Sequence, residues 1–154
     1  MLRATALLVV AALAVLTGSA VPAAAGEVHK EIKLEFDRWI DLKASDGPVT
    51  LHRFRLVRNA QGSIKSRLAR PSNSRYLEDV RLEVEYSNEA TRDWELVVRG
   101  EWSDARGEVI DGVDQSESLD EGERFQSVTI TFPTLRYGLD RGAKLQLDLF
   151  FAPD

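Results

Sequence analysis

The chain has 154 residues, no cysteine and a formal net charge of −5. An acidic balance argues against general nucleic-acid binding, which needs a basic surface. The lack of cysteine excludes disulfides, thiolate metal sites, thiol catalysis and a lipid-modified N-terminal cysteine. The length suits one ordinary domain, which packing alone must hold together.

Residues 1–25 have the layout of a secretory signal peptide. Arg3 precedes an apolar run from Ala4 to Leu16, and small residues precede the expected cleavage site after Ala25. The run is about 13 residues long, whereas a membrane-spanning helix needs roughly 20. We therefore predict an exported, periplasmic or extracellular bacterial protein with no membrane span after cleavage. A retained N-terminal anchor is the alternative.

The rest of the chain, 26–154, alternates apolar and polar residues, which is typical of half-buried strands. From Val28 to Leu42 the even positions are apolar except Lys30 and Arg38, so this row is expected to face inward. Arg38 interrupts the row, and Trp39 follows on the other side. We expect a bulge or a switch between sheets at this point.

Further strands are predicted downstream, separated by turns. The strand over 49–58 has an imperfect phase, because Leu51 fits one register and Phe54 the other. A loop is expected over 59–74 and a single helical turn within 134–142. Tyr86, Trp94 and Trp102 lie on rows predicted to face inward, so core packing is favoured over a sugar-stacking platform. The later strands are expected over 80–86, 94–102, 109–113, 128–132 and 143–151.

About seven short strands without a convincing helix predict a single immunoglobulin-like antiparallel β-sandwich over 26–154. A small closed barrel is the alternative. Three stretches, "VRLEVEYSN", "EWSDARGEVI" and "SLDEGERFQSVTI", make Val80 to Phe132 resemble bacterial extracytoplasmic immunoglobulin-like modules of the FxLyD type. Where that family has Pro-Gly-Glu, this chain has Glu121-Gly122-Glu123. The resemblance implies a β-sandwich with a binding or accessory role outside the cytoplasm.

Charges are segregated along the chain. Residues 49–77 contain no acidic residue, and residues 107–123 contain no basic one. This segregation predicts a basic surface that binds a protein or an anionic polymer, because the guanidinium group of arginine can donate two hydrogen bonds to one carboxylate or phosphate. The alternative is that the two segments lie together and neutralise each other. The candidate contact residues are Arg53, Arg55, Arg58, Lys65, Arg67, Arg70 and Arg75.

Trp39 is a second candidate contact residue. Its neighbours Asp37 and Asp41 should face water, so a large aromatic side chain is expected on a polar face. Such a ring favours a carbohydrate- or envelope-polymer-binding site. The alternative is that the basic loop covers it.

No catalytic signature is found. There is no Gly-x-Ser-x-Gly motif, and the two histidines, His29 and His52, lie on different predicted strands. The acidic segment 107–123 lacks the ligand spacing of a calcium loop. We predict a non-enzymatic binding or accessory module without catalytic residues, metal or cofactor. A carbohydrate-binding module and a structural domain without a discrete ligand are the alternatives.

Overall fold

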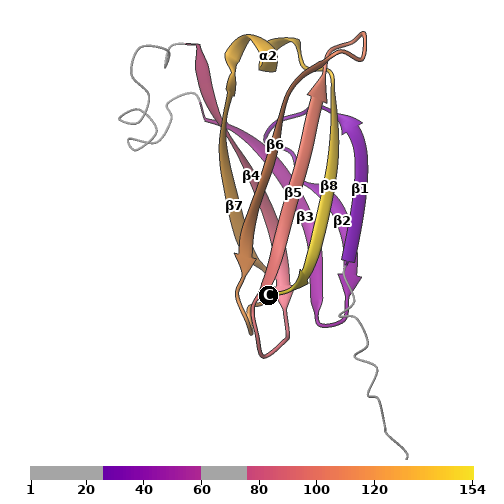
Figure 1. Ribbon diagram of the computed structural model, residues 1–154, viewed down its shortest axis with the longest axis vertical. Helices are drawn as coiled ribbons and strands as arrows, with labels where there is room; N and C mark the ends of the chain where they lie inside the picture. Colours follow the sequence, from indigo (N-terminus) through magenta and orange to yellow (C-terminus); the bar gives the residue numbers. More distant parts are fainter. Residues whose placement is uncertain (1–25, 60–75) are drawn as a thin grey trace, which may run out of the picture.

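The computed structural model describes residues 26–59 and 76–154; the predicted signal peptide lies outside them. The fold is an antiparallel β-sandwich of two four-stranded sheets (Figure 1). Sheet A contains, in order, β1 (Gly26–Lys33), β8 (Lys144–Pro153), β5 (Trp94–Ser103) and β6 (Val109–Leu119). Sheet B contains β2 (Ile40–Asp46), β3 (Val49–Asn59), β4 (Leu77–Asn88) and β7 (Gln126–Leu135). The predicted sandwich is confirmed.

The described residues form eight strands rather than seven, because the first predicted row is divided between the two sheets. β1 pairs with β8 in sheet A, while β2 pairs with β3 in sheet B. The chain crosses between the sheets through residues 34–39, so the switch expected near Arg38 is confirmed. Val28 and Leu42 are both buried, and the even positions therefore keep facing inward on either side of the crossing.

A β-bulge explains the imperfect phase of β3. Leu51 and Arg53 pair with consecutive residues of β4, which leaves His52 as an extra residue. One extra residue shifts the alternation of side chains by one position. Leu51 and Phe54 can therefore both be fully buried although they differ in parity.

β6 is longer than predicted. It continues beyond residue 113 to Leu119 and pairs with β5 along its length. Its stretch 114–118 is polar and exposed at every position, because β6 is an edge strand of sheet A. Backbone pairing rather than an apolar row holds this stretch, so alternation could not reveal it.

The core lies between the sheets and uses the rows predicted to face inward. Leu82 of β4 and Leu96 of β5 are essentially inaccessible to solvent, and the three aromatics Tyr86, Trp94 and Trp102 are buried. Core packing is therefore the role of these aromatics. The predicted helical turn is α2 (Arg136–Arg141), which follows β7 and lies at one end of the sandwich (Figure 1).

The turn between β5 and β6 is organised by Asp104. Its carboxylate accepts hydrogen bonds from the backbone N–H groups of Glu108, at 3.0 Å, and Arg106, at 2.8 Å. The bond from Glu108 is the main reason why the pKa of Asp104 is held below its ordinary value. Gly107 takes a φ of +85°, as expected for the glycine of a compact hairpin turn.

Candidate functional site

Arg53 and Arg55 lie on the outer face of sheet B. They alternate along β3 with the buried Phe54 and Leu56, so both side chains point away from the core. Each arginine meets a glutamate of β4. Arg53 donates two hydrogen bonds to Glu85, at 2.8 and 3.1 Å, and Arg55 donates one to Glu83 at 2.7 Å.

Trp39 lies over these two arginines. It ends the crossing between the sheets and is half-exposed. The guanidinium carbons of Arg53 and Arg55 are each 4.6 Å from the centre of its ring. Cation–π contacts of this kind contribute about 0.5–1 kcal/mol at exposed sites. We call Trp39, Arg53, Arg55 and their partners Glu83 and Glu85 the Trp39 platform.

The cover of Trp39 in the described structure thus comes from β3. The basic loop predicted over 59–74, which was the alternative cover for the ring, lies outside the described residues from residue 60 on. The predicted contact residues Lys65, Arg67, Arg70 and Arg75 fall there too.

An open hollow adjoins the platform where the chain leaves β1 and enters β2. Its volume is about 550 Å³. Lys33 and Arg38 extend into solvent and share Glu35, at 3.6 and 3.0 Å. Both signs of charge are present, so the hollow suits a polar partner more than an apolar ligand. Its lining consists of Ile32, Lys33, Glu35, Arg38, Trp39, Ile40 and Asp41.

Arg58 stands apart from the platform. It donates two hydrogen bonds to Glu78, at 2.6 and 3.1 Å, and one to Asp140 of α2 at 2.8 Å. The bonds to Glu78 are the main reason why the pKa of Arg58 is raised. Glu78 is buried and is also approached by Arg136 at 3.3 Å. This pairing joins β3, β4 and α2, which is a structural role.

The three described arginines of the basic segment are therefore neutralised, but by other partners than the sequence suggested. Their carboxylates come from β4 and α2, not from residues 107–123. Within that acidic segment, Asp111 accepts a hydrogen bond from Thr134 of β7 at 2.6 Å, and Asp114 meets Arg99 of β5 at 3.5 Å. The alternative, that the two segments neutralise each other, is not found among the described residues.

A serine–histidine pair occurs at the bulge of β3. His52 Nε2 lies 2.8 Å from Ser87 Oγ, and the imidazole stacks on Phe125 with ring centres 4.6 Å apart. Ser87 Oγ also accepts the N–H of Phe125 at 3.1 Å. Within the described residues no carboxylate bonds to His52, so the third member of a catalytic triad is missing. The pair joins β3 to β4, and its contacts with Phe125 hold the residue before β7 against both strands.

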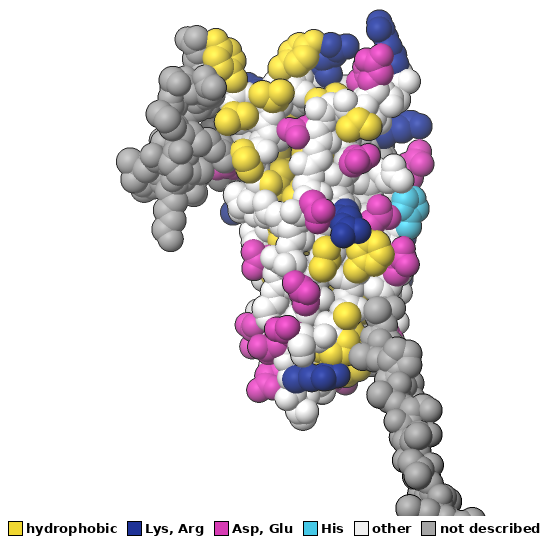
Figure 2. Space-filling view, viewed as in Figure 1, with side chains coloured by type: hydrophobic (Ala, Val, Ile, Leu, Met, Phe, Trp, Pro, Cys, Tyr) yellow, Lys and Arg dark blue, Asp and Glu magenta, His cyan; other side chains and the backbone are white. Residues whose placement is uncertain are grey.

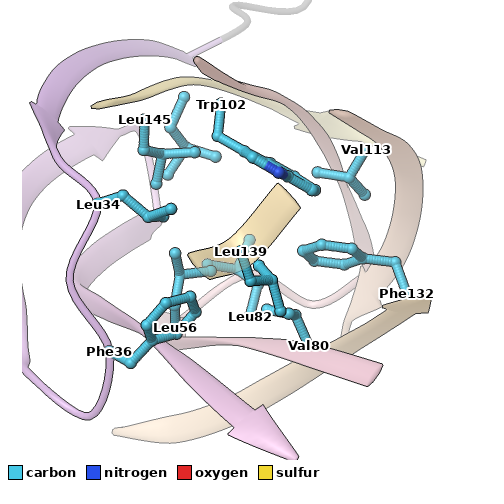
Figure 3. A pocket seen from close by; sticks show the side chains of 11 residues that line it. Leu34, Phe36, Leu56, Val80, Leu82, Trp102, Val113, Phe132, Leu139 and Leu145 are labelled. Atoms are coloured by element: carbon cyan, nitrogen blue, oxygen red, sulfur yellow. The ribbon is translucent and has the colours of Figure 1, made fainter. Parts of the chain in front are cut away.

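A small cavity lies in the core near α2 (Figure 3). Its volume is about 10 Å³, room for a single water at most. Pockets for small ligands are usually about 300–1,000 Å³. Its lining is entirely apolar, with side chains such as Leu34, Trp102 and Phe132 pointing inward (Figure 3). We regard it as a packing defect and not as a binding site.

The surface formed by sheet A carries scattered acidic side chains, while apolar ones gather toward α2 (Figure 2). Exposed Val109, Leu135 and Tyr137 belong to that end.

In the described ranges, no three His, Asp or Glu side chains gather as a metal site would require. No helix in the described part of the chain is long and apolar enough to cross a membrane.

Comparison with known proteins gives no family. No family model matches the chain, and no curated protein shows significant similarity to it. The fold and the site must therefore be interpreted from their own chemistry.

Proposed function

We propose that this protein is an exported, non-enzymatic binding module that contacts a macromolecular partner through the Trp39 platform. The supporting observation is a half-buried tryptophan stacked on two arginines of the outer face of sheet B. Tryptophan and arginine are the residue types most enriched at energetic centres of interfaces. The signal-peptide pattern of 1–25 and the resemblance to extracytoplasmic modules support a role outside the cytoplasm.

The ion pairs bear on how such a partner is bound. Glu83 and Glu85 hold the two guanidinium groups in place, which lowers the entropy lost when a partner orders them. They also cancel the positive charge of Arg53 and Arg55, so long-range attraction of an anion is weak. We infer a protein partner recognised by stacking and hydrogen bonding, with little salt dependence. An anionic polymer held by Lys65, Arg67, Arg70 and Arg75 is the alternative.

Capture with matched variants tests the platform. The purified protein is immobilised and exposed to the envelope fraction of its own organism, and Trp39→Ala is compared with Tyr137→Ala. Tyr137 is a suitable control because it is an exposed aromatic stacked with Arg141, but on α2. A partner held by wild type and by Tyr137→Ala, and lost by Trp39→Ala, supports the proposal. Equal capture by all three proteins would place the contact elsewhere.

A carbohydrate- or envelope-polymer-binding role is the second candidate, favoured by the polar hollow beside Trp39. Tryptophan fluorescence distinguishes this carbohydrate-binding role from the protein-binding role. Trp94 and Trp102 are buried, so a response to added peptidoglycan fragments reports on Trp39. Quenching that disappears in Trp39→Phe would favour the glycan. If neither capture nor quenching is observed, the remaining candidate is a structural accessory domain without a discrete ligand.

A further inference from the structure

In the described ranges 26–59 and 76–154 the sandwich has four edge strands, and β7 differs from the other three. β1 and β6 carry charges along their lengths, and β2 is charged and interrupted by a bulge at which Lys43 takes a φ of +52°. Charges and bulges are the usual devices that stop an edge strand from pairing with another chain. β7 has no charged residue from Phe125 to Leu135. It is therefore the edge least protected against pairing.

β7 is also a well-formed strand, and one of its sides pairs with no other strand among the described residues. It pairs with β4, and sheet B ends at it. Ser127, Thr129 and Thr131 are exposed on the outer face, while Ile130 is fully buried. Val128 faces inward but stays half-exposed. Short, uncharged, β-branched segments of this kind readily accept a further strand.

The usable part of this edge is limited at both ends. Phe125 has a φ of +51°, which is not a strand conformation, and Pro133 has no N–H to donate. The segment between them, 126–132, is centred on Thr129. Two antiparallel copies of this segment overlap along its whole length when Thr129 lies opposite Thr129.

We propose that β7 pairs antiparallel with β7 of a second copy of this chain, about a two-fold axis at Thr129. In this register Thr129 faces Thr129, Ser127 faces Thr131, and Val128 faces Ile130 across the axis. No like charges meet, and the half-exposed Val128 gains an apolar neighbour. The two B sheets then form one continuous sheet. Such an interface is isologous, the commonest arrangement in soluble dimers.

The charge distribution favours this occupant over pairing through the neighbouring edge. β6 lies on the same side of the sandwich, as the bond from Thr134 to Asp111 shows. It carries Asp111, Asp114 and Glu117 without a basic residue, so two β6 strands repel each other. Because β6 lies beside β7, the acidic β6 strands of the two copies also approach each other when two β7 strands pair. Added salt screens this repulsion, so the proposed dimer should strengthen as ionic strength rises.

Sedimentation equilibrium of the purified protein over a wide concentration range tests the dimer. We expect a monomer–dimer equilibrium, and Thr129→Lys should weaken it roughly tenfold or more, because two ammonium groups would face each other. The variant should fold, since the new lysine lies opposite Glu83 on β4. The control is Ser116→Lys on the edge strand β6, which lies outside the β7 interface and should not weaken the dimer. A monomer at every concentration, or a dimer insensitive to Thr129→Lys, would overturn the proposal.

Cysteine cross-linking tests the register, and the chain has no native cysteine to interfere. Thr129→Cys should form a disulfide-linked dimer under mild oxidation. Ser127→Cys and Thr131→Cys should cross-link when mixed, and each much less when alone. Cross-linking of Ser116→Cys in preference to Thr129→Cys would mean that β6 is the interface, which contradicts the proposal.

Discussion

The buried pair of Arg58 and Glu78 supports a sharp prediction about stability. The Glu78 side chain is 2% exposed and the Arg58 side chain 31%. Arg58→Ala removes two hydrogen bonds from a carboxylate that water cannot reach. Breaking a buried pair in this way costs about 3–5 kcal/mol. Because Arg136 still approaches Glu78 at 3.3 Å, we expect the lower end, about 3 kcal/mol.

The opposite substitution should cost less. In Glu78→Gln the remaining Arg58 is partly solvated and keeps Asp140, so we expect a loss of about 1–2 kcal/mol. Arg124→Ala is the control: Arg124 pairs with Glu89 at 3.0 Å, but both side chains are largely exposed. Its effect should stay within about 0.5 kcal/mol.

Urea unfolding followed by circular dichroism measures all three variants. If the slope of the unfolding free energy against urea concentration is the same in all variants, differences between their unfolding midpoints report differences in stability alone. If Arg58→Ala costs no more than Arg124→Ala, the buried pair does not contribute as its geometry indicates, and the reasoning from burial is wrong.

Three further outcomes are expected. Leu96→Ala should lower the unfolding free energy by about 2–5 kcal/mol in a urea melt, because the side chain is fully buried. Glu95 is exposed, so Glu95→Ala should change it by no more than about 0.5 kcal/mol. The reverse order would refute the register of β5. The lowered pKa of Asp104 adds stability above its unfolded pKa of about 3.9, and this stability is lost as pH falls through the lower folded value. Asp104→Asn should therefore lose less stability than wild type on acidification, and parallel curves would contradict this. N-terminal sequencing of the exported protein should begin at Gly26, and a retained leader would contradict cleavage.

The strands and their inward faces could be predicted because burial on one face leaves alternation in the sequence. Leu82 and Leu96 were placed correctly in this way, and so was the switch between sheets near Arg38. β6 was cut short because alternation disappears in a strand exposed on both faces. Glu83 lies on the polar face of β4, yet its side chain is only 14% exposed because it bonds to Arg55. Alternation within one strand could not reveal this burial, because the partner lies on another strand.

The candidate site was only half visible in the sequence. Arg53 and Trp39 were named, but their contact depends on how β2 pairs with β3, and a bulge in β2 between Asp41 and Ala44 shifts that register. The repeat Arg-x-Arg on β3 and Glu-x-Glu on β4 was the available signal for the ion pairs. It becomes informative only when the register is known, and the long connection between these strands hides the register.

The pairing of β1 with β8 has a mechanical consequence. Gly26 lies beside Phe151, so the first and last strands meet at the end of the sandwich opposite α2 (Figure 1). A force that pulls these two ends apart would break the hydrogen bonds between β1 and β8 one after another. A force applied between Gly26 and α2 would instead load many hydrogen bonds together. The domain should therefore yield easily to tension across its termini and resist tension along its length.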